Sequence, residues 1–364
     1  MKKNTWCLFI PCTLVLVVLL SGCEIIYPPV MYEAAPTRIS YDLSYGYRIN
    51  STGTGLYEIT YLCDTPEALL GTVTYNLLYS DEYQTRTLFN NTFIYWNISS
   101  KDEKTFELGI RTQVEAESFL VADLNGEDAL TIGQINETYP GITNQFTRLQ
   151  ANETIRFIDP DDPDITTIAN EVFSNAKTNN SFLLAKSLFF WLKQHIQYQS
   201  HPDEKVVRPA VVTLSKKQGD CDDLSFVYIS LCRALGIPAR LIRGYLLTEN
   251  IDGTMTAIAH AWTEVFVGGT GSFNGWIPIE CACCSSSIKT DVDQNFGVES
   301  AFHLRLFTDD GSNESLVSSL SGISYITYSP DITISLQSFA DIRNYQELES
   351  KKLVITEKNI RHYE

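Results

Sequence analysis

The chain has 364 residues, 44% of them hydrophobic, and carries 44 acidic against 27 basic residues, so its formal net charge is −17. This acidity argues against nucleic acid or an anionic surface as a partner, because like charges repel. The hydrophobic content is ordinary for a globular protein, and the length allows two domains.

Residues 1–22 have the pattern of a secretory signal. Lys2-Lys3 precede an apolar run, residues 8–20, that is shorter than the roughly 20 residues needed to cross a bilayer. Leu20-Ser21-Gly22-Cys23 resembles a lipobox, which predicts cleavage before Cys23 and lipid attachment to its sulfur. An uncleaved N-terminal anchor is the alternative. In both cases we expect the folded part to lie outside the cytoplasm, tethered to the cell membrane.

A tether and a series of strands follow the signal. Residues 23–37 contain three prolines and are typical of an extended linker. Residues 38–150 hold segments of alternating or β-branched and aromatic residues, separated by turn residues, which predicts a β-sandwich domain. The expected strands are residues 37–49, 56–62, 72–79, 92–98 and 105–114. The sandwich either presents substrate or acts as a spacer.

Two helical patterns open the next domain, residues 151–310. After the turn-forming segment 159–164, apolar residues recur at three- and four-residue spacing and form one face of a helix. They are Ile165, Ile168, Ala169, Val172, Phe173 and Ala176. Residues 181–197 are apolar around much of the helix, so we expect that helix to be buried, with Phe190 and Trp191 in the core.

A third helical pattern begins at Cys221 and ends at Gly236, followed by Pro238. Asp220 is suited to cap this helix, with Asp223 as its capping-box partner. A thiol in the first helical turn lies near unpaired backbone N–H groups and the positive end of the helix dipole, which favour the thiolate. The neighbouring aspartates oppose this effect, so we expect a cationic partner for the sulfur.

His260 lies on an expected strand, residues 258–267. Alternate strand residues share a face, so His260 and Trp262 point the same way, toward a face that the helix of Cys221 could cover. Glu280 ends a short expected strand, residues 276–280, and could accept an imidazole N–H, which fixes the tautomer and stabilises the imidazolium. Each residue alone is usually structural, but together they supply the thiol, imidazole and carboxylate of a nucleophilic cysteine site.

The region from residue 181 to residue 280 resembles the transglutaminase-like superfamily, whose core is papain-like. The resemblance is carried by Gly219-Asp220-Cys221, residues 231–240, Gly244-Tyr245, residues 260–265 and Trp276-Ile277-Pro278. It implies that Cys221 is the nucleophile and His260 the general base. The third member in the family is usually aspartate, whereas this chain has Glu280, which is one methylene longer.

The resemblance gives the expected fold class. It is α+β, with a cysteine at a helix N-terminus packed on an antiparallel sheet that carries the histidine and the glutamate. A β-sandwich precedes this core, and a β-rich extension, residues 311–364, follows it.

Three cysteines follow Glu280 closely. Cys281 and Cys284 form a C-x-x-C pair, but a single pair is weak evidence for zinc. A disulfide is the commoner explanation in an oxidising compartment, and Cys63 could be a further partner. Packed thiols, Cys283 among them, are the third alternative. We expect no metal and no organic cofactor.

These features predict a membrane-anchored extracytoplasmic cysteine enzyme that acts on amide bonds of proteins or peptides. The Cys221 thiolate would attack the carbonyl, the backbone N–H of Cys221 and a second donor near Gln218 would hold the oxyanion, and His260 would protonate the leaving amine. The resulting thioester favours hydrolysis, by a protease or amidase, over cross-linking. The alternative is a catalytically inactive, lipid-anchored binding or scaffold module. We expect structural ion pairs at Arg233, Arg240 and Arg243.

Overall fold

The computed structural model describes residues 29–149, 156–201, 207–269, 271–318 and 322–364. The predicted signal and the predicted lipid attachment site at Cys23 lie outside these residues. Within the described part, every helix is too short or too polar to cross a bilayer.

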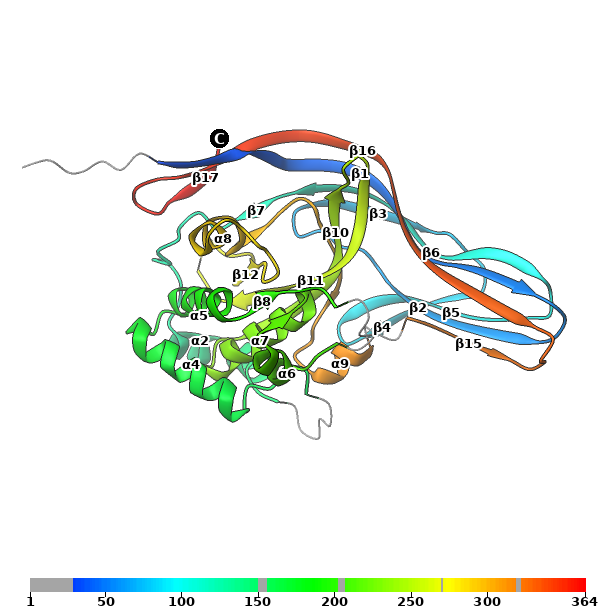
Figure 1. Ribbon diagram of the computed structural model, residues 1–364, viewed down its shortest axis with the longest axis horizontal. Coiled ribbons are helices and arrows are strands. Elements are labelled where there is room, and N and C mark those ends of the chain that lie inside the picture. The colour runs from blue at the N-terminus through cyan, green and yellow to red at the C-terminus, as the bar shows by residue number, and fades with distance from the viewer. Residues whose placement is uncertain (1–28, 150–155, 202–206, 270, 319–321) are drawn as a thin grey trace, which may run out of the picture.

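Two antiparallel sheets form the elongated end of the molecule (Figure 1). The first has the order β17 (Arg361–Tyr363), β16 (Thr333–Ile355), β1 (Val30–Thr52), β6 (Lys104–Glu117) and β3 (Gly71–Leu77). The second has the order β15 (Ile323–Thr327), β2 (Tyr57–Asp64), β5 (Asn91–Ser100) and β4 (Tyr83–Leu88). Inward side chains of both sheets, such as Ile39, Ile59 and Trp96, share one buried core.

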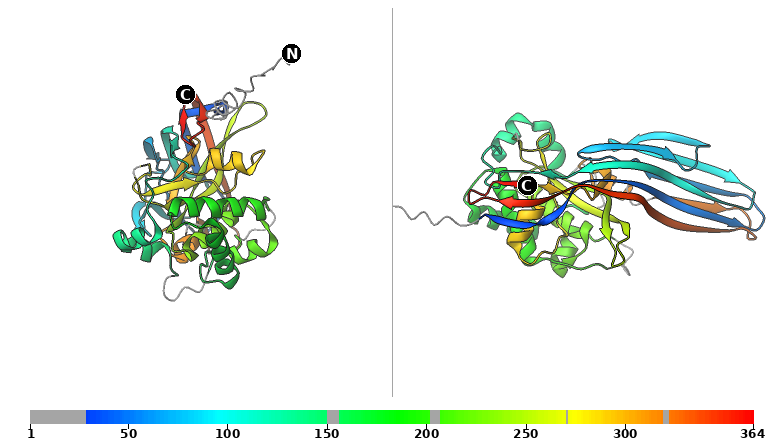
Figure 2. Two further views of the ribbon diagram at one scale, coloured as in Figure 1. Left: turned by 90° about the vertical axis from the view of Figure 1, so that its left-hand side faces the viewer. Right: turned by 90° about the horizontal axis from the view of Figure 1, so that it is seen from above.

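The two longest strands come from opposite ends of the chain. β1 and β16 pair from Val30 opposite Ile355 to Thr52 opposite Thr333, and they run as one ribbon along the molecule (Figures 1 and 2). The predicted tether is therefore wrong from Val30 onward. The strand accommodates Pro36 because its pairing register shifts between Pro36 and Arg38, where a proline without an N–H is tolerated. The predicted C-terminal extension supplies strands to both sheets.

The compact end combines a four-stranded antiparallel sheet with helices. The sheet order is β12 (Trp276–Ile279), β11 (Met255–Phe266), β10 (Ala239–Glu249) and β14 (His303–Thr308). Helices α4 (Pro163–Ala176), α5 (Ser181–His195) and α7 (Cys221–Ala234) share a second buried core with this sheet. A parallel pair, β8 (Gln197–Tyr198) and β9 (Gln218–Gly219), leads directly into α7.

The remaining short elements connect these parts. They are β7 (Phe119–Leu120), α2 (Ile132–Thr138), α3 (Pro140–Phe146), α6 (Ala210–Lys216), α8 (Ile288–Asn295), β13 (Val298–Glu299) and α9 (Asn313–Ser318).

Helix α5 is buried along one broad face and not all round. The buried residues include Phe182, Ala185, Phe189 and Leu192, at three- and four-residue spacing. Phe190 lies on the opposite side and is 42% exposed, so its prediction as a core residue is wrong. Trp191 is partly buried against the core and stacks on the ring of His195, with ring centroids 4.5 Å apart.

The N-terminus of α4 has a side-chain cap. Oδ1 of Asp162 accepts the backbone N–H groups of Asp164 at 2.9 Å and Ile165 at 3.2 Å. We expect Asp162→Ala to lower the free energy of unfolding by about 1 kcal/mol, because two helix N–H groups lose their acceptor. Asp162→Asn keeps the acceptor and should change the free energy of unfolding by about a few tenths of a kcal/mol at most. Urea unfolding of both variants checks this, and equal losses would contradict the capping role.

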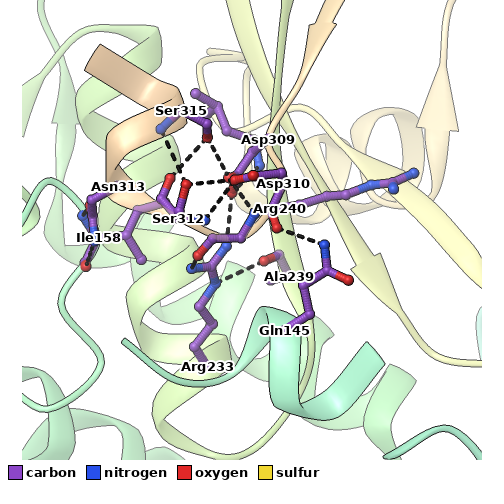
Figure 3. A network of polar contacts seen from close by, with 12 residues as sticks. Gln145, Ile158, Arg233, Ala239, Arg240, Asp309, Asp310, Ser312, Asn313 and Ser315 are labelled. Atoms are coloured by element: carbon purple, nitrogen blue, oxygen red, sulfur yellow. Dashed lines mark hydrogen bonds and ion pairs between the residues drawn. The ribbon is translucent and has the colours of Figure 1, made fainter. Parts of the chain in front are cut away.

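The C-terminal end of α7 is held by a buried polar network (Figure 3). Arg233 donates to Asp309 at 2.8 Å and to the backbone oxygen of Ala239 at 2.9 Å, and Ser315 donates to Asp309 at 3.2 Å. Burial raises the pKa of Asp309, while the charge of Arg233 opposes that rise. The network fixes α7 against the sheet at the end opposite Cys221.

The predicted structural ion pairs of three arginines are confirmed. The pairs are Arg233–Asp309 at 2.8 Å, Arg240–Glu264 at 2.6 Å and Arg243–Asp222 at 2.8 Å.

Candidate active site

Cys221 is the first residue of α7, as predicted, and the helix begins with the predicted capping box. The Asp220 side chain accepts the N–H of Asp223, and the Asp223 side chain accepts the N–H of Asp220. Asp223 is fully buried and binds Nε2 of His201 at 2.7 Å. Asp222 pairs with Arg243 at 2.8 Å. The three aspartates beside the thiol are thus occupied by N–H groups and by the side chains of His201 and Arg243.

His260 lies on β11 between a carboxylate and the thiol. Its Nε2–H donates to Oε2 of Glu280 at 2.7 Å. The Cys221 side chain lies close enough to the same imidazole to raise its pKa, and Nδ1 is the ring nitrogen that Glu280 leaves for the sulfur. The His260 side chain is 8% exposed. The three residues singled out in the sequence therefore meet at one place.

Glu280 follows β12 directly and has donors on both carboxylate oxygens. Oε1 accepts the backbone N–H of Ala282 at 2.8 Å, and Oε2 lies 3.2 Å from Nε2 of His303 as well as 2.7 Å from His260. His303 was not predicted from the sequence. It begins β14, and no spacing in the chain relates it to Glu280.

The electrostatics of this cluster favour a charged imidazole. Burial lowers the pKa of His260, but the charge of Glu280 and the contact with Cys221 outweigh it and raise that pKa to about 10. Burial would raise the pKa of Glu280, whereas the charge and hydrogen bonds of His260 and His303 hold it well below its usual range. At neutral pH the pair is an imidazolium and a carboxylate, so the cationic partner expected for the thiolate is present.

The raised pKa of His260 makes stability depend on pH in one direction. The folded protein holds this proton more tightly, so its contribution is complete below the usual value of 6.5 and is lost as pH rises through about 10. We expect the free energy of unfolding to fall over this window, and to fall less in His260→Gln. Urea unfolding at several pH values checks this, and parallel curves for the two proteins would contradict it.

The two faces of β11 have different neighbours. Ala261 and Val265 lie in the buried core with α7, whereas Trp262, on the face of His260, donates to Glu299 at 2.9 Å. The predicted alternation of faces is therefore confirmed. The expectation that the helix covers the His260 face is wrong, because the body of α7 covers the other face. Its first turn, with Cys221, reaches the imidazole.

The described cysteines carry free thiols, so the predicted disulfides are absent among them. Cys281 points into the core near Thr263, while Cys284 is exposed, and Cys63 lies in the core of the two large sheets. Burial raises the pKa of Cys281 to about 12 and also raises that of Cys283. These thiols are poor nucleophiles, because the protonated form dominates at neutral pH.

His260, Glu280 and His303 are also zinc-type ligands, with three donor atoms within 4.8 Å of one another. Around a tetrahedral zinc with bonds of about 2.0–2.1 Å, ligand atoms stand about 3.4 Å apart. The 2.7 Å between His260 and Glu280 is a hydrogen-bond distance and is too short for two ligands of one ion. A second cluster of possible ligands, His201, Asp220 and Asp223, has the same feature, because Nε2 of His201 lies 2.7 Å from Asp223. In both clusters the described distances are those of hydrogen bonds.

Residues 166–281 match the model of the transglutaminase-like superfamily, and this span contains Cys221, His260 and Glu280. The chain carries a transglutaminase-like domain. No curated protein sequence matches the chain.

Several solved structures are similar to the chain at low identity. A candidate cysteine protease from Cytophaga hutchinsonii aligns over 93% of this chain and 100% of its own, with 14% identity and a TM-score of 0.49. The periplasmic domain of TgpA from Pseudomonas aeruginosa covers 65% of this chain and 87% of its own, with 14% identity and a TM-score of 0.34. Red sea bream transglutaminase covers 62% of this chain and 45% of its own, with 12% identity and a TM-score of 0.30. All three scores lie below 0.5, so no residue role is transferred from them.

A depression of about 530 Å³ lies beside the segment that follows Glu280. It is lined by the end of α5, by Tyr198 and Lys217, and by residues 283–288 after Glu280. Burial raises the pKa of Tyr198, which lines the depression.

Proposed function

We propose that the chain is a cysteine-dependent hydrolase of protein or peptide amide bonds, with Cys221, His260 and Glu280 as its catalytic triad. The observation that carries the proposal is the position of His260, whose imidazole lies between the Cys221 thiol and the Glu280 carboxylate. This arrangement brings a thiolate, a proton donor and an orienting carboxylate together at one place.

The mechanism follows from these three groups. The Cys221 thiolate attacks the amide carbonyl, and the oxygen gains a negative charge that the Cys221 backbone N–H stabilises, since a first-turn N–H has no partner within the helix. The His260 imidazolium gives its proton to the leaving amine, and a thioester forms. Neutral His260 then takes a proton from water, which attacks the thioester and releases the acid and the thiolate. Glu280 holds the imidazole throughout.

Hydrolysis is favoured over cross-linking because the segment that follows Glu280 lines an open, polar depression. Its walls include serines 285–287 and Lys217. An amine can compete with water for a thioester only where the site excludes water.

We further propose that lipid on Cys23 holds the enzyme outside the cytoplasm, with the catalytic part close to the membrane. Strand β1 begins beside the catalytic part, where Tyr32 donates to Asp293 of α8 at 2.7 Å (Figure 1). Seven residue steps separate Cys23 from Val30, a reach of at most about 25 Å. The two large sheets would then be a β-sandwich domain that extends away from the helices. This geometry favours substrate presentation over a spacer role.

The proposal is tested with the soluble chain from Val30 onward, an unstructured protein such as casein, and a fluorescent primary amine. We expect new peptide termini or free ammonia, with little amine incorporated, and neither product from Cys221→Ser. Amine incorporation that exceeds hydrolysis would establish a cross-linker in place of a hydrolase. Binding of casein without turnover, equal in both proteins, would favour the inactive binding or scaffold module.

A further inference from the structure

Glu280 has a second imidazole partner that the proposed mechanism does not use. Nε2 of His303 lies 3.2 Å from Oε2, the same oxygen that binds His260 at 2.7 Å, and the N–H of Ala282 holds Oε1 at 2.8 Å. An ionised carboxylate only accepts hydrogen bonds, so all three neighbours donate to it. Both oxygens of Glu280 are therefore fixed.

His303 is itself fixed in place. Its Nδ1 lies 2.9 Å from Oγ of Ser300, and its ring packs edge-on against Trp262 with ring centroids 4.8 Å apart. Nδ1 also lies 3.3 Å from the backbone oxygen of Ser300, so both ring nitrogens of His303 have partners. The His303 side chain is 7% exposed, so water competes little for these bonds.

The length of the Glu280 side chain explains why the contact with His303 matters. Glutamate has one more rotatable sp³ torsion than aspartate, so its carboxylate has about three times as many staggered arrangements. Only an arrangement that binds Nε2 of His260 orients the imidazole toward Cys221. A second donor fixed at Oε2 selects that arrangement.

We propose that His303 is a positioning residue of the active site, which holds Glu280 in the arrangement that orients His260. The inference rests on the proposed function, because it assigns His303 a part in the same site. His303 acts through Glu280 and takes no proton from substrate.

A purely electrostatic role of His303 would have the opposite sign. A second donor on Oε2 draws negative charge from the carboxylate, which alone would weaken the attraction of Glu280 for His260. Removing His303 would then strengthen the His260 interaction and make Cys221 more reactive. Loss of positioning makes Cys221 less reactive, so the rate of thiol reaction separates the two effects.

The test is the second-order rate of Cys221 alkylation by iodoacetamide, mapped by mass spectrometry, from about pH 5 to pH 10. His303→Leu fills the site without a donor, whereas His303→Gln keeps an N–H donor at similar reach. We expect Cys221 of His303→Leu to be alkylated about ten- to a hundredfold more slowly at neutral pH, which is the range expected for the loss of one hydrogen bond to a charged group. Fast alkylation should also be confined to a narrower range of pH. His303→Gln should stay within about threefold of the wild type.

Two controls keep the outcome interpretable. His362→Leu changes an exposed histidine on β17 and should leave the rate unchanged. Ser300→Ala removes the closer of the two Ser300 oxygens beside Nδ1, at 2.9 Å against 3.3 Å, without touching Glu280. It should slow the reaction by less than His303→Leu. If His303→Leu fails to fold, as judged by its thermal unfolding transition, the Ser300→Ala rate decides: a slower rate supports the inference and an unchanged rate overturns it.

The outcomes also separate this inference from the proposed function. If wild-type Cys221 reacts like an ordinary thiol, the proposed function fails. If Cys221 is activated but His303→Leu reacts as fast as the wild type or faster, only the positioning role is overturned. Equal slowing by His303→Leu and His303→Gln also overturns it, because the donor would then be irrelevant.

Discussion

Replacing Cys221 with alanine is expected to reduce amide hydrolysis by about 10⁴-fold or more, because no other group at the site can form the thioester. The fold should persist, since Cys221 is only partly buried at the start of α7. Initial rates of peptide release, with thermal unfolding as a check on folding, measure the effect.

The matched control is Cys284→Ala, which removes an exposed thiol from the depression beside residues 283–288. It should leave hydrolysis within about threefold of the wild type, since Cys284 takes no part in the row of Cys221, His260 and Glu280. A large loss in Cys284→Ala with a small loss in Cys221→Ala would show that Cys221 is not the nucleophile.

Replacing Arg305 with methionine is expected to lower the free energy of unfolding by about 3–5 kcal/mol. Arg305 binds Glu264 at 2.6 Å and also binds Glu299, and both carboxylates are at most 4% exposed. Burial raises the pKa of Glu264, but the charges of Arg305 and Arg240 outweigh burial and lower it. Without Arg305, the buried carboxylate of Glu299 keeps the hydrogen bond from the Trp262 N–H at 2.9 Å but loses its cationic partner.

The control for Arg305 is Arg38→Met, which breaks an ion pair with Glu115 whose partners are 48% and 41% exposed. An exposed pair contributes about 0–1 kcal/mol, so this loss should be small. Urea unfolding of the three proteins measures both changes. Arg305 binds Glu264, which lies on the same face of β11 as His260, and this ion pair is expected to stabilise that face. Similar losses of stability at the two sites would contradict this role.

The local features of the site could be predicted from the sequence, because each depends on neighbouring residues. The cap at Asp220 and the start of α7 follow from residue types within one helical turn. The shared face of His260 and Trp262 follows from strand alternation. Glu280 lies where the end of a short strand places it.

The errors concern contacts between distant segments or a choice between faces. Pro36 suggested a linker, yet β1 continues through it because β16, some 300 residues later, pairs with it across a register shift. His303 contacts Glu280 although β10 and β11 separate β14 from β12 in the sheet, and no local pattern in the sequence predicts a contact across two strands. Phe190 was placed in the core because α5 is apolar over most of its surface, and only packing decides which side faces solvent.

The exposed edge strand β4 escaped prediction for a related reason. All six of its residues are exposed, so its sequence lacks the alternation that marks a half-buried strand. The cysteines after Glu280 were expected to pair, but Cys281 turns into the core and Cys284 turns to solvent. Spacing in the chain does not fix these directions.

Activation of Cys221 by His260 is tested most directly by the rate of Cys221 alkylation in the wild type and in His260→Ala. We predict that wild-type Cys221 reacts at neutral pH much faster than an ordinary thiol, and that His260→Ala slows the reaction. If Cys221 reacts as an ordinary thiol and at the same rate in both proteins, the active-site assignment is wrong.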